Sequence, residues 1–299
     1  MINDSIAYEL RRTFPQLKLL ENEPMKLHSS FRIGGPADLF AEPASEAELW
    51  ALYRFLLKKG IRPAVIGNGT NLLVRDEGVR GVVIHLGDGF SGICLRDGLI
   101  RAEAGVTLAK LAVFAKEHGM AGLEFAHGIP GSLGGAVMMN AGAYGGEMKD
   151  VVVSVRYLDE AGHICETAEP GFAYRQSMFT GRACTVLGAA LRLQQDAPEA
   201  IHGRMMELWA KRSASQPLEK PSAGSTFKRP ATGYAAAMIE QAGLKGLTVG
   251  GAQVSEKHAG FVINTGSASF ADVTALMAKI TDAVYEKFGV YLEPEVRIL

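Results

Sequence analysis

The N-terminal part of the chain alternates between helical and strand-like hydrophobic patterns. Residues 45–48, Ser-Glu-Ala-Glu, form a capping-box pattern, and the apolar positions after them are spaced for one helical face: Leu49, Leu52, Tyr53, Leu56 and Leu57. This spacing predicts a helix that stops at Gly60. Two short apolar runs, 63–66 and 81–86, predict buried strands on either side of a glycine-rich loop.

Short strands dominate the middle of the chain, and helices dominate its last third. Strand patterns recur at 92–95, 99–104, 151–158, 163–168 and 184–193, and helices are predicted at 107–118 and 132–140. The sequence at 159–162 is typical of a hairpin turn. After a polar connection, helical patterns cover 198–213, 234–242 and 269–288, the last beginning with Ser269 and Asp272 and ending at Gly289. The change predicts a domain boundary near residue 196.

Composition and charge narrow the class of protein. The 299 residues are 47% hydrophobic and 21% charged, which excludes a disordered chain. The net charge is -1, so the protein lacks the overall positive potential of a nucleic-acid binder. The three cysteines are widely spaced, so they predict neither a disulfide framework nor a metal site. The N-terminus shows no secretory signal, and the longest uncharged stretch, 125–146, is broken by glycines and a proline. We expect a cytoplasmic protein without membrane insertion.

Glycine is enriched, with 35 residues, and two glycine-rich loops stand out. The first, Gly67-Asn68-Gly69-Thr70-Asn71-Leu72, follows a predicted strand and could form a nest of backbone N–H groups for a pyrophosphate. A plain connecting turn is the alternative interpretation. The loop lacks the Gly-Lys-Ser/Thr ending of a P-loop and leads into no helix, which disfavours a nicotinamide-binding Rossmann motif.

The second loop covers 128–146 and is too rich in glycine for a simple turn. Its polar members, Ser132, Asn140 and Tyr144, suit a backbone wrapped around a planar or phosphorylated ligand. A helix that packs Ala-Val-Met-Met into the core is the alternative.

Seven blocks of sequence together resemble the UDP-N-acetylenolpyruvoylglucosamine reductases. They are FRIGGPAD (31–38), GNGTNLLV (67–74), GIPGSLGGAVMMNAGAYGGE (128–147), YRQSMF (174–179), PSAGSTFKRP (221–230), AGLKGLTVGGAQVSEKHAGFVIN (242–264) and LEPEVR (292–297). The length is similar to that of the shorter branch of the family. Two positions depart from it: Arg229 stands where the family often has a substrate-binding Asn, and the common terminal glycine is missing.

The resemblance implies an α+β flavoprotein with the vanillyl-alcohol-oxidase-type fold. It implies a first FAD-binding subdomain at 1–86, completed by about 291–299, a second at 87–196, and a substrate-binding domain at 197–290. The implied cofactor is non-covalent FAD, and NADPH is the implied co-substrate. Cofactor contacts are expected at Gly67, Asn68, Gly69, Thr70, Asn71, Leu72, Gly128, Gly131, Ser132, Gly134, Gly135, Asn140, Ala141 and Gly142.

The implied reaction reduces UDP-N-acetylglucosamine enolpyruvate to UDP-N-acetylmuramate for peptidoglycan synthesis. Charge that develops beside the substrate carboxylate must be stabilised, and a carbanion must receive a proton. The resemblance assigns the carboxylate clamp to Arg175, the proton donor to Ser225 and stabilisation of the enol form to Glu295. Without it, Arg175 would be a surface ion pair, Ser225 a turn residue, and Glu295 an exposed carboxylate in a strand at 290–297, paired with Arg297. In the role that the resemblance implies, Pro294 restricts the backbone before Glu295 and fixes the direction of its side chain.

Substrate contacts are expected, by the same resemblance, at Tyr174, Lys228, Lys245 and His258, the last replacing a glutamine of the longer branch. Basic residues also concentrate around Ser225, where they could attract the anionic ligands: Lys211, Arg212, Lys220, Lys228 and Arg229. The alternative interpretation is that these residues form a solvated basic face. Two other functions remain open. A flavin oxidase of the same fold would not need the three catalytic residues, and a non-catalytic flavin or nucleotide-sugar binding module would not turn over.

Overall fold

The structure is a computed structural model that describes residues 4–299, and it divides into two units, each assembled from three stretches of chain. Unit 1 comprises Met1–Glu21, Asp38–Asn68 and Arg80–Lys211, and unit 2 comprises Asn22–Ala37, Gly69–Val79 and Arg212–Leu299. These units are defined by contacts within the chain. The functional subdomains expected from the sequence are defined by ligands, so they stay a prediction.

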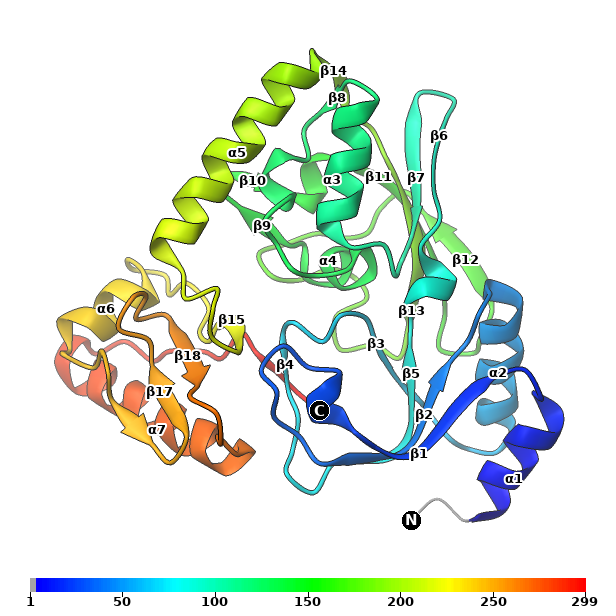
Figure 1. Cartoon of the computed structure of the whole chain (residues 1–299), viewed down its shortest axis with the longest axis horizontal. Helices are drawn as coiled ribbons and strands as arrows, with labels where there is room; N and C mark the ends of the chain where they lie inside the picture. The colour runs from blue at the N-terminus through cyan, green and yellow to red at the C-terminus, as the bar shows by residue number, and fades with distance from the viewer. Residues whose placement is uncertain (1–3) are drawn as a thin grey trace. The chain divides into compact units, whose positions relative to one another are not determined.

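A four-stranded sheet with two helices begins the fold (Figure 1). Its order is β1 (Lys18–Pro24), β2 (Pro36–Glu42), β5 (Val79–His85) and β3 (Ala64–Ile66), with α1 (Asp4–Thr13) and α2 (Glu46–Lys58). The predicted helix α2 is confirmed, and Leu49, Leu52 and Leu56 are buried on one face. Ser45 caps it by accepting from the Glu48 N–H at 3.2 Å, whereas the Glu48 carboxylate accepts from Ala44 rather than from Ser45.

The second sheet of unit 1 is antiparallel throughout. Its order is β12 (Ile164–Thr167), β11 (Val152–Leu158), β13 (Thr185–Leu191), β7 (Leu99–Glu103) and β6 (Ile93–Arg96). These strands and the helices α3 (Leu108–Glu117) and α4 (Leu133–Met139) confirm the predictions for the middle of the chain. The predicted turn between β11 and β12 is also confirmed, because the Asp159 carboxylate accepts from the N–H groups of Ala161 and His163.

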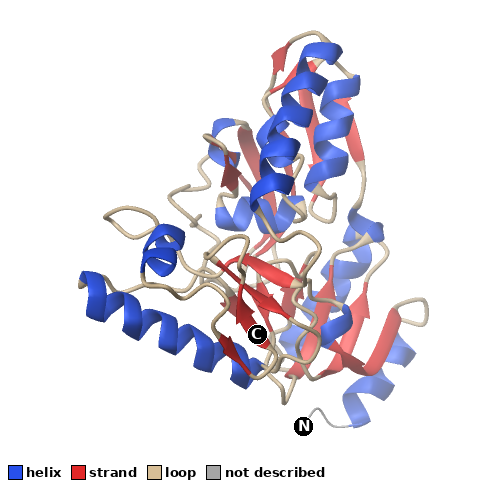
Figure 2. Ribbon diagram, turned by 60° about the vertical axis from the view of Figure 1, so that its left-hand side comes forward, coloured by secondary structure: helices blue, strands red, loops and turns tan. Residues whose placement is uncertain are grey.

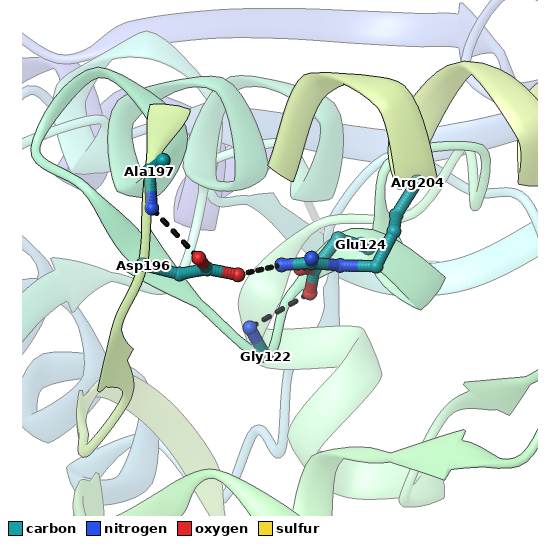
Figure 3. Close-up of polar contacts among 5 residues, drawn as sticks. All are labelled: Gly122, Glu124, Asp196, Ala197 and Arg204. Atoms are coloured by element: carbon teal, nitrogen blue, oxygen red, sulfur yellow. Dashed lines mark hydrogen bonds and ion pairs between the residues drawn. The ribbon is translucent and has the colours of Figure 1, made fainter. Parts of the chain in front are cut away.

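The remaining elements of unit 1 are short, apart from the first part of α5 (Pro198–Ser215). Two-residue strands pair as β8 (Met120–Ala121) with β14 (Gln194–Gln195) and β9 (Gly142–Ala143) with β10 (Gly146–Glu147). Figure 3 shows how α5 is attached: the Arg204 guanidinium donates to Glu124 at 2.7 and 2.9 Å and to Asp196 at 2.7 Å. A planar guanidinium can serve both carboxylates at once, which fixes the start of the helix.

Unit 2 contains one antiparallel sheet and two helices. The sheet order is β15 (Ser222–Ser225), β18 (Phe261–Asn264), β17 (Ala252–Val254) and β16 (Thr248–Val249), and the helices are α6 (Ala235–Gln241) and α7 (Phe270–Phe288). Figure 2 shows the long α7 beside these strands, onto which it packs Val273, Leu276 and Ile280. The predicted capping box of Ser269 and Asp272 is confirmed on both sides, and Gly289 ends α7 with a φ of 65°.

The strand predicted over 290–297 is wrong for most of its length. The only strand there, β19 (Arg297–Ile298), pairs in parallel with β4 (Leu72–Leu73). Before it, buried Leu292 and Val296 hold the segment on the core of unit 2. Pro294 has no N–H to donate, so it forms an isolated bridge with Phe227 instead of a continuous ladder.

None of the helices within the described residues combines the length and the apolar character needed to cross a membrane.

Candidate active site

The two glycine-rich loops predicted to bind a cofactor meet in unit 1. The Asn68 side chain donates to the Pro130 carbonyl at 3.1 Å, although 62 positions separate the two residues. A Cβ atom at Gly67 would stand 2.1 Å from the Ser132 Oγ, so any other residue there would require the Ser132 side chain to move. The structure therefore brings the end of β3 against the start of α4.

Several backbone N–H groups at this junction have no hydrogen-bond acceptor within residues 4–299. They belong to Gly67, Asn68, Gly131, Ser132 and Gly135. By contrast, the N–H groups of Leu133 and Gly134 donate to Val106 and Ala104, each at 2.8 Å.

The surroundings of these N–H groups suit a phosphorylated ligand. A Cβ at Gly135 would meet only the Ser132 Oγ, at 3.8 Å, and buried Ser132 does not cap the helix with its side chain. Neighbouring N–H groups without a partner in the protein, beside open space, suit the binding of a diphosphate. The residues present fit the pyrophosphate of FAD.

The rest of the first loop is held within unit 2. Gly69 has a φ of 61°, and a Cβ there would stand 2.0 Å from the His28 carbonyl oxygen. The Asn71 side chain donates to the Glu295 carbonyl at 3.2 Å, and Leu72 pairs with Arg297. Thr70, between Gly69 and Asn71 in the sequence, is half-buried. Asn71 and Leu72 thus anchor the C-terminal segment, and their predicted contact with the cofactor stays a prediction.

In the second loop, Asn140 uses its whole side chain within the protein. It is 1% exposed and has a left-handed backbone with a φ of 43°. Its amide group donates to Glu147 at 2.6 Å and to the Ala173 carbonyl at 3.1 Å, and its side-chain oxygen accepts from Lys149 at 2.9 Å. Ala141 and Gly142 lie at the start of the small β9–β10 hairpin, and Gly128 begins the second loop, two residues before Pro130, which Asn68 contacts.

Arg175 and Tyr174 form the tip of a tight turn in unit 1. The turn is closed by hydrogen bonds between Ala173 and Gln176 at 3.0 and 3.2 Å. Arg175 has a φ of 55°, a conformation that costs about 1 kcal/mol or more outside glycine, and its guanidinium lies 5.2 Å from the centroid of the Tyr174 ring. A position that favours glycine nevertheless carries an arginine, which is typical of a functional side chain.

Ser225 and Glu295, which are 70 positions apart, lie on neighbouring backbone segments of unit 2. The Glu295 N–H donates to the Thr226 carbonyl at 2.8 Å, and the Lys228 N–H donates to the Glu293 carbonyl at 2.8 Å. Between Ser222 and Ser225 the register with β18 shifts by one residue, at Gly224 with a φ of 76°. Such a bulge re-aims the side chain that follows it, and here that side chain is Ser225.

The lysines predicted to bind substrate each have a carboxylate partner in unit 2. Lys228, whose side chain is 15% exposed, is paired with Glu293, and Lys245 is paired with Glu240 at 2.5 Å. Sequence reasoning missed both glutamates, because neither stands at a regular helical spacing from its lysine. Arg229, at the departure from the family pattern, lies 4.0 Å over the ring of exposed Tyr234. The basic concentration near Ser225 is therefore partly neutralised.

His258 is held in a defined orientation in the same unit. Its Nδ1 accepts from the Gly260 N–H at 3.2 Å, and its ring packs edge-on against Phe261. Burial lowers the pKa of His258, and the nearby Lys245 ammonium lowers it further. The ring is then neutral, and an Nδ1 acceptor leaves the proton on Nε2 as a donor.

Among the described residues, no group of three His, Cys, Asp or Glu side chains is arranged to hold a metal ion.

Comparison with known proteins first defines the class. Residues 37–168 match the model of the FAD binding domain family. A solved structure of alkyldihydroxyacetonephosphate synthase, 16% identical, has a TM-score of 0.50 and covers 65% of this chain and 41% of that chain, which reflects a shared fold. With the paired glycine loops, these matches identify an FAD-binding protein of the vanillyl-alcohol-oxidase type.

More specific matches then define the family. Residues 216–299 match the model described as UDP-N-acetylenolpyruvoylglucosamine reductase, C-terminal domain. The reductase of that name from Caldanaerobacter subterraneus subsp. tengcongensis is 50% identical over 97% of each chain. The crystal structure of UDP-N-acetylenolpyruvylglucosamine reductase from Thermus caldophilus, 34% identical, has a TM-score of 0.81 and covers 95% of this chain and 98% of that chain. The chain belongs to the UDP-N-acetylenolpyruvoylglucosamine reductase family and is an FAD-dependent oxidoreductase.

Proposed function

We propose that this enzyme uses NADPH to reduce UDP-N-acetylglucosamine enolpyruvate to UDP-N-acetylmuramate, a precursor of peptidoglycan, in the cytoplasm. The observation that carries the proposal is the pairing of the segments that hold Ser225 and Glu295, directly after a glycine bulge. The match of this region to the C-terminal domain of the reductases supports the same substrate. The predicted division into two FAD subdomains and a substrate domain, with about residue 196 as the boundary, belongs to this proposal.

When bound, FAD supplies the redox chemistry by relaying a hydride from the nicotinamide to the vinyl carbon of the substrate. Arg175 holds the substrate carboxylate, for which a planar guanidinium offers two parallel donors. Glu295 stabilises the enol form of the intermediate through a hydrogen bond. Ser225 donates the proton to the neighbouring carbon, since a neutral hydroxyl needs no prior protonation, and it regains a proton from solvent.

The UDP-sugar and the cofactor are held by the remaining residues. We assign the sugar nucleotide to Tyr174, Lys228, Lys245 and His258, and the FAD to the two glycine loops. The fixed Nε2–H of His258 supports its assignment, because it offers a donor like that of the glutamine in the longer branch. The loop at 67–72 contains neither His nor Cys, so we expect FAD to bind without a covalent bond.

The decisive experiment follows the visible flavin band of the purified protein without oxygen. NADPH should bleach the band, and UDP-N-acetylglucosamine enolpyruvate should restore it with formation of UDP-N-acetylmuramate, detected by mass spectrometry. UDP-N-acetylglucosamine, which lacks the double bond, is the control and should restore nothing. A parallel series with NADH measures the coenzyme preference.

Other outcomes would overturn the proposal. A bleached band that the enolpyruvyl substrate leaves bleached, but that admitted dioxygen restores, would indicate an oxidase, and a band that NADPH leaves unchanged would indicate a binding module. Flavin that remains with the polypeptide after acid precipitation would contradict non-covalent binding.

A further inference from the structure

The turn that presents Arg175 is fastened on both sides to one short helix. On the N-terminal side, the Asn140 amide donates to the Ala173 carbonyl at 3.1 Å. On the C-terminal side, the hydroxyls of Ser177 and Thr180 donate to the Met138 carbonyl at 2.8 and 2.9 Å. Both attachments lie at the end of α4, so hydrogen bonds on both sides hold the turn in its strained backbone conformation.

Asn140 is itself locked in place. Its amide group also donates to the Glu147 carboxylate at 2.6 Å, and its oxygen accepts from the Lys149 N–H at 2.9 Å. These two bonds define which end of the side chain faces Ala173, because a flipped amide would place oxygen against carboxylate. Its left-handed backbone, with a φ of 43°, is one that asparagine tolerates better than most residues.

The opposite end of α4 carries the candidate cofactor loop. Ser132 precedes the helix, and the N–H groups of Ser132 and Gly135 are among those with no acceptor in the described chain. The helix has seven residues, so its two ends are separated by about 10 Å. One rigid element thus joins the cofactor loop to the turn of Arg175, all within unit 1.

We propose that Asn140, oriented by Glu147, is a positioning residue for Arg175. Through α4, Asn140 fixes the position of the Arg175 turn relative to the cofactor loop. The proposal rests on the assignment of Arg175 to the substrate carboxylate. It differs from the expectation that Asn140 contacts the cofactor, because every polar group of this side chain is engaged within the protein.

The test compares Asn140→Gly with Asn22→Gly. Both substitutions remove an asparagine side chain at a left-handed position, and glycine tolerates that backbone, so only the side chain changes. Asn22, with a φ of 52°, is exposed and serves as the matched control.

Hydrogen exchange supplies a measurement that needs no substrate. In Asn140→Gly the Gln176 N–H, which bonds to Ala173, should exchange about tenfold faster or more. The Gly134 N–H at the other end of α4 should keep its protection, and Asn22→Gly should change neither. Unchanged exchange at Gln176 would overturn the proposal.

Stopped-flow kinetics then ask whether Asn140 acts through Arg175. In Asn140→Gly, bleaching by NADPH should be near normal, while reoxidation by the enolpyruvyl substrate should slow by about tenfold or more. In an Arg175→Met background the same change should cost less than about twofold, because the group it positions is gone. Equal costs in both backgrounds would overturn the proposal.

Two further outcomes are separable. If Asn140→Gly does not fold, Ser177→Ala provides a second test, because it removes one of the two hydroxyl groups that donate to the Met138 carbonyl. The Gln176 N–H should then also exchange faster, by a smaller factor. If the wild-type enzyme is not reoxidised by the substrate, the proposed function fails, and the exchange measurements still decide the role of Asn140.

Discussion

The candidate cofactor site of unit 1 is built from backbone groups, whereas the candidate substrate site of unit 2 is built from side chains. In unit 1, glycines bring two loops together and leave N–H groups for an anionic ligand. In unit 2, two lysines with carboxylate partners and a neutral histidine accompany Ser225 and Glu295.

This difference determines which changes each site tolerates. A backbone site depends on the absence of side chains, so adding one methyl group should disable it. A side-chain site depends on particular charges and donors, so removing one should weaken binding without emptying the site.

The largest effect is expected when a methyl group is added to the cofactor loop. In Gly135→Ala the new Cβ meets no atom of the protein closer than 3.8 Å, so the apoprotein should remain as stable as the wild type or more so. Its affinity for FAD should fall by about 10- to 100-fold, because the methyl group occupies space assigned to the cofactor. Fluorescence titration of apoprotein with FAD and thermal unfolding measure the two effects.

Gly203→Ala is the matched control. It lies in α5, where a Cβ meets nothing within 4 Å, and it should stabilise the helix by about 1 kcal/mol without changing FAD affinity. Unchanged FAD affinity in Gly135→Ala would show that the loop does not bind the cofactor.

An intermediate effect is expected when a charge is removed from the substrate site. Lys245→Ala should raise KM for the UDP-sugar by about tenfold or more, through loss of a charged hydrogen bond, with little change in kcat or FAD content. Lys211→Ala is the control, since Lys211 is also paired with a glutamate, Glu207, at 2.6 Å but lies on exposed α5. Steady-state kinetics in which both variants resemble the wild type would leave Lys245 as a surface residue.

The smallest effect concerns acid stability. Burial lowers the pKa of His258 below its ordinary value of 6.5, so the unfolded chain binds a proton at a pH where the folded chain does not. The contribution of this residue to stability therefore falls as the pH drops below about 6.5 toward the lower folded pKa. His258→Gln should flatten the pH dependence of the unfolding free energy between about pH 7 and about pH 5.

His127 of unit 1 provides the comparison for this measurement. Burial lowers its pKa as well, so His127→Gln should flatten the same curve in the same direction. Denaturant unfolding at several pH values tests both variants. A slope that neither substitution changes would contradict the direction of both shifts.

The sequence predicted local structure better than contacts between distant segments. The helix after Ser45, the helix after Ser269 and the hairpin at 159–162 carry their signals within a few residues, and all three are confirmed. The helix α1 and the strands β1 and β2 were not predicted. In β1 only Leu19 is buried, so polar positions obscure the alternation that marks a strand.

The site shows the same limit. The two glycine loops were predicted separately, but spacing along the chain could not show that Gly67 packs against Ser132. The pairing of the Glu295 segment with Thr226 is also a contact between distant segments, which the strand expected over 290–297 does not reveal. Asn140 was assigned to the cofactor by resemblance, because its hydrogen bonds within the protein become visible only in the fold.

The central claim is that the chemistry divides between flavin reduction and delivery of a proton from the substrate site, and Ser225→Ala tests it most directly. Stopped-flow absorbance without oxygen should show near-normal bleaching by NADPH, because that step needs no proton donated to carbon. Reoxidation by UDP-N-acetylglucosamine enolpyruvate should slow by about 100-fold or more, as expected when a general acid is lost. Reoxidation at the normal rate would make Ser225 a turn residue, and slow bleaching as well would point to a disturbed flavin site; either result would contradict the account.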